Sequence, residues 1–390
     1  MPASMSFATA EPSTMSRRYD VVVLGVGGFG SAVCYHLARR GVSVLGLEQF
    51  HIAHERGSSH GDTRIIRQAY FEHPDYVPLL RRAYELWDEL EESAATELFR
   101  RTPLLISGPL GGETISGALR AATLHGLAIE QLSASEARTR FPGIRVPDEH
   151  AVVVEPNAGF LWVERCVRAH AKHAVRLGAD IRPNLPVRGV SIERDRVRVD
   201  TGAETIEATK LVVTAGASTR RVLADLDWPL TVVRKFVGWF STSAGAYRSE
   251  EGYPVFYFEL PTGAFYGFPC LDGQTIKVAE HLSGEPVTDP ECVDRAVRPD
   301  DLALLVPFLH SVLPLATTQL VRHSVCLYTH TPDRHFLIDR HPLWPHVTIA
   351  AGFSGHGFKF TSVLGEALAD LCLDGTTRFP IGFLSATRWT

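Results

Sequence analysis

The hydrophobic and polar positions near the start of the chain follow two different periods. Residues 21–24 (VVVL) form a short apolar run, which is typical of a buried strand. From residue 31 to residue 40 the apolar positions recur at the spacing of one helix face, and Gly41 follows as a helix stop. A second apolar run ends at Glu48. The pattern predicts a strand, a helix and a second strand in succession.

The same two periods continue along the chain. Helical spacing predicts helices over residues 76–92, 113–125, 163–177 and 361–373. A further helix is predicted to open at Ser133, because Glu136 follows three residues later in a capping-box pattern. Apolar runs predict strands at residues 103–107, 187–192, 197–199, 210–217, 275–280, 325–328, 336–339 and 347–351.

Residues 227–300 differ from the segments on either side. Aromatic, strand-like runs alternate there with proline and glycine turns, at residues 232–240, 255–260 and 265–268. This composition predicts an inserted antiparallel sheet. A sheet of this kind beside an α/β domain leaves a cleft between the two, which is the usual place for a small ligand.

We therefore expect an α/β fold, with a Rossmann-type domain built from discontinuous segments and an α+β domain that contains the antiparallel sheet. The first domain is assigned residues 19–96, 151–226 and 322–390, and the second residues 97–150 and 227–321. Residues 1–18 hold all three methionines and lack the apolar core of a signal peptide, so we interpret them as a disordered leader or the trace of a misplaced start.

Three glycines connect the first strand to the first helix. Gly25, Gly27 and Gly30 form the pattern G-x-G-x-x-G. Glycine at these positions permits a sharp turn and lets a pyrophosphate approach the helix N-terminus, and Glu48 is placed to accept hydrogen bonds from a ribose. With strand, helix and acid all present, the pattern predicts a dinucleotide site. It does not say which dinucleotide binds.

Composition excludes several classes of protein. A chain of 390 residues with 45% hydrophobic and 21% charged residues is ordinary for a globular enzyme. The formal charge of -5 and the lack of a basic, aromatic-rich stretch argue against nucleic acid as a partner, and no apolar stretch reaches membrane length. The six cysteines lie far apart, which argues against disulfides or zinc and favours the cytoplasm. Each is interpreted as a small buried residue.

The polar loop over residues 49–70 is long enough to fold back over a cofactor, although a solvated surface loop is the alternative. His51 and His54 have a spacing that could suit a metal, but no third ligand is near, so we predict no metal site. Arg64 and Arg67 are three residues apart, and their planar guanidinium groups suit a carboxylate. An exposed strand or helix edge is the other interpretation of this pair.

Lysine is rare in this chain, with five lysines against thirty-four arginines. Lys277 lies in an apolar strand, on the opposite face from its two neighbours, and taken singly it is best interpreted as a solvated outer residue. Lys359 follows a glycine-rich turn over residues 352–357. The backbone amides of such a turn could cradle a carboxylate or a ring oxygen, and the lysine adds a positive charge there.

Together these segments resemble a known family. The residues that carry the resemblance are Gly25–Gly30, GSSHGDTRIIR at 57–67, YGFP at 266–269, CLYTHTPD at 326–333 and AGFSGHGFKF at 351–360. From residue 19 to about residue 383 the sequence resembles monomeric sarcosine oxidase and its relatives, N-methyltryptophan oxidase and pipecolate oxidase.

The resemblance implies that the dinucleotide is FAD, attached through its 8α-methyl group to Cys326. It also implies a set of cofactor contacts from the N-terminal, middle and C-terminal parts of the sequence: Gly25, Gly27, Gly30, Glu48, Ser58, Thr63, Arg64, Val187, Cys326, Gly352, Gly355, Gly357 and Lys359.

The resemblance further implies roles around the flavin ring and the substrate. Catalytic roles fall to Lys277, Arg64, His281 and His60, with Lys277 promoting the reaction with O2. Arg67 and Lys359 would hold the substrate carboxylate, and the substrate cavity would be lined by Tyr328, Phe265 and Tyr257.

The implied activity is oxidation of a secondary amino acid, either N-methyl or cyclic. A hydride equivalent passes to the flavin, O2 is reduced to H2O2, and the imine product hydrolyses. We expect a monomer whose partners are the substrate and O2. Phe265 and Tyr257 depart from the tyrosine and methionine of sarcosine oxidases, which leaves the identity of the substrate open. The alternatives are a dehydrogenase that uses another electron acceptor and a non-catalytic flavin-binding protein.

Overall fold

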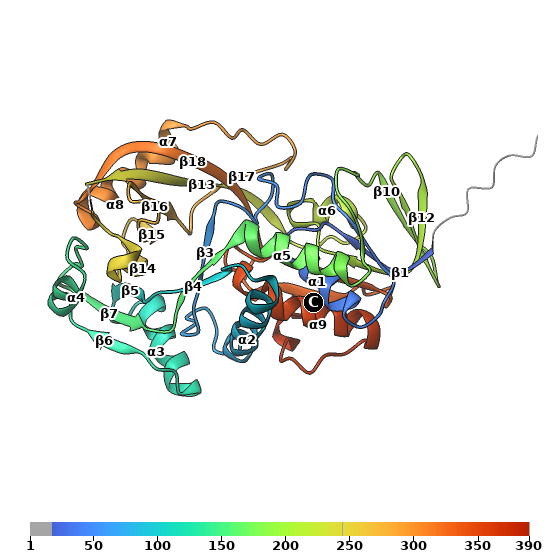
Figure 1. The fold of residues 1–390 in the computed structure, drawn as a ribbon, viewed down its shortest axis with the longest axis horizontal. Helices are drawn as coiled ribbons and strands as arrows, with labels where there is room; N and C mark the ends of the chain where they lie inside the picture. The colour runs from blue at the N-terminus through green and yellow to red at the C-terminus, as the bar shows by residue number, and fades with distance from the viewer. Residues whose placement is uncertain (1–17, 244, 390) are drawn as a thin grey trace, which may run out of the picture.

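The computed structural model describes residues 18–243 and 245–389. Residues 1–17 of the predicted leader lie outside the described residues, and Arg18 opens the first strand. Two large sheets organise this part of the chain, and Figure 1 shows them at opposite ends of the molecule.

The first sheet has eight strands in the described residues, with the parallel pair formed by β1 and β12 near its middle. The strands that follow one another across it are β10 (Gly189–Ile192), β11 (Val197–Asp200), β12 (Thr205–Val213), β1 (Arg18–Leu24), β2 (Val44–Leu47) and β9 (Asp180–Arg182). β20 (Val347–Ala351) pairs in parallel with the second half of β12, and β19 (Leu337–Arg340) pairs with β20. The end of the chain thus returns to the sheet that its beginning started.

Helices cover this sheet because their apolar faces must be removed from water. α1 (Gly28–Ala38) packs against both α5 (Val163–Arg176) and α9 (Thr361–Asp374), and α2 (Tyr76–Ala94) packs against α9. Figure 1 shows these four helices gathered on one side of the molecule. The short helix α6 (Thr219–Val222) follows β12.

The second sheet has nine strands in the described residues and is mostly antiparallel. Its strands are β17 (Glu285–Pro286), β13 (Thr231–Thr242), β16 (Thr275–Glu280), β15 (Gly263–Phe268), β14 (Val255–Leu260), β5 (Leu104–Pro109), β7 (His150–Glu155) and β6 (Glu130–Leu132), with β18 (Ala316–His330) paired along β13. Its helices are α3 (Glu113–His125), α4 (Ala134–Arg140), α7 (Pro299–Ala303) and α8 (Leu305–Val312). A small sheet of β3 (Thr63–Ile66), β8 (Gly159–Trp162) and β4 (Phe99–Arg101) lies between the two large ones.

Most predicted elements are present. The capping box at α4 is confirmed, since the hydroxyl of Ser133 accepts from the backbone N–H of Glu136 at 3.2 Å. Two strands lie in the second sheet although the predicted boundaries assigned them wholly or partly to the first domain. β7 pairs with β5 and β6, and residues 322–330 of β18 pair with β13. Both strands continue a hydrogen-bonded ladder that residue periodicity alone does not reveal.

Strand alternation separates the two faces of the nine-stranded sheet. Tyr257, Tyr266 and Lys277 point to the face that meets β3, whereas Phe256 and Phe265 point to the other face and pack around α8. Successive side chains of a strand project to opposite sides, so this division follows from the register. The face toward β3 carries the polar groups of the candidate site.

A helix long and apolar enough to span a membrane is not found in residues 18–243 and 245–389.

Candidate active site

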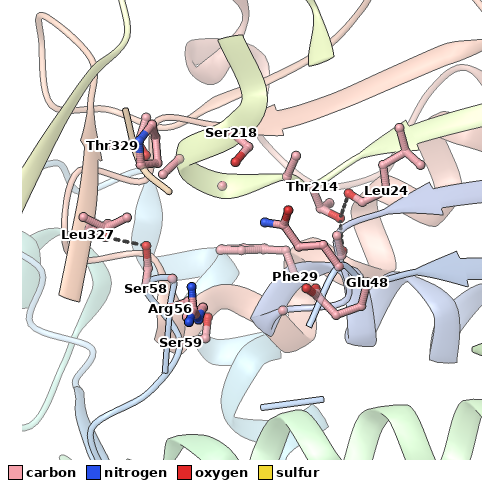
Figure 2. Close-up of a pocket in the computed structure, with 18 of the residues that line it drawn as sticks. Leu24, Phe29, Glu48, Arg56, Ser58, Ser59, Thr214, Ser218, Leu327 and Thr329 are labelled. Atoms are coloured by element: carbon pink, nitrogen blue, oxygen red, sulfur yellow. Dashed lines mark hydrogen bonds between the residues drawn. The ribbon is translucent and has the colours of Figure 1, made fainter. Parts of the chain in front are cut away.

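A cavity of about 550 Å³ runs along the carboxyl ends of the first sheet's parallel strands. Figure 2 shows Glu48 and Thr214 on one side of it, with Ser58 and Leu327 on the other. The volume falls in the usual range for a ligand site, about 300–1,000 Å³. Ligands of open α/β sheets bind at this edge of the strands, so the cavity has the position of a dinucleotide site.

The predicted glycine turn forms part of the cavity wall, and its geometry requires glycine. Gly25 has a φ of +87°, and a Cβ at Gly30 would lie 1.8 Å from the carbonyl oxygen of Gly25. Gly25 and Gly27 line the cavity, while Gly30 lets α1 pack against the turn. α1 therefore presents its N-terminus to the cavity, as a pyrophosphate requires.

Polar groups surround this turn. Glu48 lines the cavity at the end of β2, and its carboxylate accepts from the backbone N–H groups of Val26 at 2.9 Å and Phe50 at 3.1 Å. His54 Nε2 lies 3.3 Å from the same carboxylate. Ser59, which the sequence did not single out, accepts at its hydroxyl from the N–H of Gly28 at 3.2 Å.

The second glycine-rich turn closes the other end of the cavity. Gly352 and Gly355 have φ values of +60° and +85°, and a Cβ at Gly355 would lie 2.3 Å from the ring of Tyr328. A Cβ at Gly357 would lie 2.7 Å from Phe353. Gly352, Gly355 and Gly357 all line the cavity, as does Val187. All four were predicted to contact the cofactor, and that role stays a prediction.

Arg64 joins this cavity to a second one, because its side chain lines both. Its guanidinium donates to the carbonyl of Ser58 at 3.0 Å, to the carbonyl of Thr63 at 2.9 Å and to the Sγ of Cys326 at 3.3 Å. Ser58 in turn donates its hydroxyl to the carbonyl of Leu327. The loop after β2 is thus tied to β18.

Cys326 contacts the guanidinium of Arg64, and only 1% of its surface is exposed to solvent. Burial raises the pKa of its thiol, but the nearby His60, Arg64 and Lys277 together outweigh burial and lower the pKa to about 6. His60 is held by Ser324, whose hydroxyl lies 3.1 Å from His60 Nδ1. A thiolate is therefore favoured at neutral pH, which is the nucleophilic form of cysteine. Composition alone had interpreted Cys326 as a small buried residue.

Lys277 is 3% exposed, so the solvated interpretation of this lysine is wrong. Its ammonium donates to the carbonyl of Gly61 at 2.6 Å, and to the carbonyl and hydroxyl oxygens of Thr63 at 2.8 and 3.1 Å. Burial, followed by the charge of Arg64, lowers the pKa of Lys277 well below its ordinary value. Thr63 contacts this lysine and is not among the residues that line either cavity.

The second cavity has a volume of about 60 Å³ and is rich in charge. Arg67 lines it, sandwiched between the rings of Tyr70 and Phe71 at 4.3 and 3.9 Å from the ring centroids. Its guanidinium donates to both carboxylate oxygens of Glu72, at 2.8 and 2.6 Å. Arg67 therefore already binds a carboxylate of the protein, through the single nitrogen Nη2, while its Nη1 donates to the carbonyl of Ala69.

Lys359 lines the same cavity from the short 3-10 turn Phe358–Phe360. It donates to the carbonyl of His356 at 2.7 Å. Burial and then the charge of Arg67 lower the pKa of Lys359 to about 7, while Glu72 opposes the shift. Both predicted carboxylate ligands thus meet in one small cavity, and Lys359 lies there rather than in the dinucleotide cavity.

Neutral polar and apolar side chains form the remaining wall. His281 lines the small cavity with its ring centroid about 6 Å from those of Tyr257, Tyr266 and Tyr328. Burial first, and then Lys235, lower the pKa of His281 to about 3, so the imidazole is neutral near pH 7. The hydroxyls of Tyr266 and Tyr328 lie 3.3 Å apart, but Tyr328, which was predicted to line the substrate cavity, lines the large cavity and not the small one.

One predicted cavity residue is on the wrong side of the sheet. Phe265 stacks on Phe308 of α8 with ring centroids 4.5 Å apart, because strand alternation turns it away from the cavity. Tyr266, its neighbour in β15, lines the cavity instead. Tyr257 does line the cavity, as predicted.

Other residues of the small cavity were missed because they carry no motif of their own. Glu72, His356 and Tyr266 fall within or beside motifs that had been identified, yet only the fold brings them together. One indication of their role was present in the sequence, which is that each lies one to five residues from a residue predicted to bind or surround the substrate.

The comparisons with known proteins agree with this geometry. A family model described as DAO, FAD dependent oxidoreductase, matches residues 20–371. The chain belongs to the FAD-dependent oxidoreductase family. This oxidoreductase is 40% identical over 380 residues to the monomeric sarcosine oxidase of Arthrobacter sp. (strain TE1826), covering 96% of this chain and 97% of that protein. It is 34% identical over 377 residues to the N-methyl-L-tryptophan oxidase of Salmonella agona (strain SL483), covering 96% and 100%.

The fold of this oxidoreductase is also that of a solved structure. NikD, described as an unusual amino acid oxidase essential for nikkomycin biosynthesis, superposes with a TM-score of 0.84 at 24% identity, covering 95% of this chain and 98% of that chain. The cofactor is FAD, and the large cavity of this FAD-dependent oxidoreductase fits it, since the glycine cradle and Glu48 provide for pyrophosphate and ribose.

Proposed function

We propose that this protein is an oxidase of secondary amino acids that uses covalently attached FAD and O2 and produces an imine and H2O2. The observation that carries the proposal is the meeting of Arg67 and Lys359 in a small cavity that Arg64 joins to the dinucleotide cavity. A carboxylate ligand there would have its reacting carbon close to the end of the cofactor. The names of the relatives, sarcosine oxidase and N-methyl-L-tryptophan oxidase, support the reaction type.

The cofactor would be held at both ends by this chain. Gly25, Gly27 and the N-terminus of α1 would bind the pyrophosphate, and Glu48 the ribose. Bound FAD supplies the capacity to accept two electrons from a carbon–nitrogen bond and to pass them to O2. Cys326 is the proposed attachment residue, which its lowered thiol pKa and its contact with Arg64 support.

The substrate carboxylate would bind to Arg67 and Lys359. Because both oxygens of Glu72 already receive hydrogen bonds from Arg67, the substrate would take over the position of this carboxylate.

The cations of the small cavity would also affect the protonation of the substrate amine. Arg64, Arg67 and Lys359 disfavour a protonated amine in the cavity, so they favour the neutral amine that can donate electrons.

The size of the cavity supports a small substrate. Its volume of about 60 Å³, together with the space that the Glu72 carboxylate would vacate, and the ring of Tyr257 in its wall favour an N-methyl or cyclic amino acid with a small side chain. We further propose a cytoplasmic monomer, which the word monomeric in the name of the sarcosine oxidases and the free thiols of all six cysteines support.

Lys277 is the proposed oxygen-activating residue. It places an amine in a buried position near Arg64, where its N–H groups, and its positive charge when it is protonated, would stabilise negative charge on reduced oxygen. If electrons went to another carrier, as in a dehydrogenase, this cation would have no such role.

The experiment that tests the proposal is a peroxide assay with sarcosine, other N-methyl amino acids, L-pipecolate and L-proline. Peroxide formed with at least one of them, in step with O2 consumption, supports the oxidase. Substrate-dependent reduction of an artificial electron acceptor without peroxide would indicate a dehydrogenase. No turnover with any of them, together with a flavin that these compounds do not bleach, would favour the flavin-binding protein.

A further inference from the structure

The two cations of the small cavity share one aromatic ring. Tyr70 is fully buried, and its ring centroid lies 4.3 Å from the guanidinium carbon of Arg67 and 5.1 Å from the ammonium nitrogen of Lys359. Other rings contact only one of the two, since Phe71 lies over Arg67 and Phe360 lies over Lys359 among the described residues. Tyr70 is therefore the aromatic ring that the two cations have in common, and the carboxylate of Glu72 also acts on both.

A shared ring has a physical use here. Arg67 and Lys359 are both buried and repel each other, as the effect of Arg67 on the pKa of Lys359 indicates. The face of an aromatic ring carries partial negative charge and attracts cations within about 6 Å. The ring of Tyr70 can thus stabilise both charges without placing a second carboxylate in the cavity.

The phenol of Tyr70 is fixed by His356. Nε2 of His356 lies 2.9 Å from the carbonyl of Arg334, which can only accept, so Nε2 carries the hydrogen. Nδ1 then accepts from the hydroxyl of Tyr70, with 2.5 Å between the two atoms. The carbonyl of the same histidine accepts from Lys359 at 2.7 Å. One residue therefore sets the positions of both the ring and one of its cations.

The backbone on the other side is anchored as well. Glu155 is buried in β7 and accepts from the N–H groups of Gln68 and Ala69 at 2.7 and 2.9 Å. Arg67 donates to the carbonyl of Ala69 at 2.7 Å. These bonds fix the backbone between Arg67 and Tyr70. The ring of Tyr70 is therefore held in place relative to the guanidinium of Arg67.

We propose that Tyr70 is a positioning residue of the carboxylate site, whose ring holds Arg67 and Lys359 together and is itself held by His356. The inference rests on the proposed role of these two cations in binding the substrate carboxylate. It predicts that the affinity for an anionic ligand follows the electron density of the ring at position 70, whereas the affinity for a neutral ligand of the same shape does not.

The test uses the holoenzyme with acetate and the neutral isostere acetamide, each titrated by the change in flavin absorbance. Tyr70→Phe is compared with variants that carry one, two or three ring fluorines at position 70, which keep the shape of the ring and withdraw charge from its face. Acetate affinity should fall stepwise, by about tenfold over the series. Acetamide affinity should stay within about twofold of that of the Phe variant.

Tyr76 provides the matched control. Its ring lies 5.0 Å from that of Tyr70, centroid to centroid, and its hydroxyl contacts His335 rather than His356. The same fluorine series at position 76 should leave acetate affinity unchanged. An acetate affinity that does not vary with fluorination at position 70, or that varies equally at position 76, would overturn the proposal.

Two further variants separate this inference from the function on which it rests. Arg67→Met and Lys359→Met should each weaken acetate binding by about tenfold or more. If neither does, the carboxylate site itself is wrong. If both do but fluorination at position 70 has no effect, the site is right and the role of Tyr70 is wrong. The unfluorinated Phe variant should bind acetate more weakly than the wild type, because it lacks the bond to His356.

Discussion

The guanidinium Nη2 of Arg64 lies 3.3 Å from the Sγ of Cys326, across 262 residues of sequence. The contact joins the loop after β2 to strand β18, and with His60 and Lys277 it makes a buried thiolate the favoured form of this cysteine. Arg64 also lines both cavities. The proposed attachment residue, the cofactor cavity and the substrate cavity thus meet at a single side chain.

The first prediction concerns Cys326. Acid-precipitated wild-type protein should stay yellow, because a covalent bond survives unfolding. Cys326→Ser should release its flavin to the supernatant, since a serine hydroxyl remains protonated and does not replace the thiolate. Cys292→Ser, at an exposed cysteine, is the control and should behave as the wild type. A colourless wild-type pellet would refute the covalent attachment.

The second prediction concerns Lys277. Lys277→Met should leave reduction by substrate largely intact and slow reoxidation by O2 by about 10²-fold, because the proton-donating amine is lost where negative charge develops. Stopped-flow absorbance measures the two half-reactions separately. Lys172→Met, at an exposed position of α5, should alter neither. Equal losses in both half-reactions of Lys277→Met would argue against the assigned role.

The third prediction concerns pH. The pKa of Lys359 is lowered to about 7, so this lysine is charged below that pH and neutral above it. Acetate binding to the holoenzyme should therefore weaken as pH rises through 7, by about tenfold or more between pH 6 and pH 9. Lys359→Arg keeps its charge over this range and should show a flatter profile. A wild-type affinity that is constant across this range would contradict the assignment.

The fourth prediction compares two aromatic residues of neighbouring strands. Tyr257→Ala enlarges the small cavity and should shift kcat/KM toward N-methyl amino acids with larger side chains by about tenfold. Phe265→Leu removes a ring that stacks on Phe308, so it should lower the free energy of unfolding by roughly 1–3 kcal/mol and leave the substrate preference unchanged. A changed substrate preference in Phe265→Leu would indicate that Phe265 lines the substrate cavity after all.

Much of the fold could be predicted from periodicity, because helix and strand spacing are local properties of the sequence. The strand and helix that flank the glycine turn were identified in that way, while the turn itself and Glu48 were identified from their motif, and together they line or build the large cavity. The membership of β7 in the second sheet could not be predicted, because strand pairing depends on segments far apart in the chain.

In the candidate site, too, the properties that depend on residues far apart in the sequence could not be predicted. Lys277 looked like a solvated residue because alternation shows which face it occupies but not what covers that face, and the covering residues, Gly61 and Thr63, lie over two hundred positions away. Phe265 was assigned to the cavity through a resemblance, and the alternation of β15 corrects it. Glu72 was missed because its partner, Arg67, had been considered only as a ligand for the substrate.

We have proposed that the small cavity binds a secondary amino acid next to the flavin, and that O2 reoxidises the flavin after the amino acid has reduced it. The most direct measurement is the flavin absorbance of the purified protein when sarcosine, L-proline or L-pipecolate is added without oxygen and air is then admitted. We expect at least one of these compounds to bleach the flavin and air to restore the colour, with one H2O2 formed per cycle. A flavin that stays oxidised with every secondary amino acid tested, or one that bleaches and is not restored by air, would contradict it.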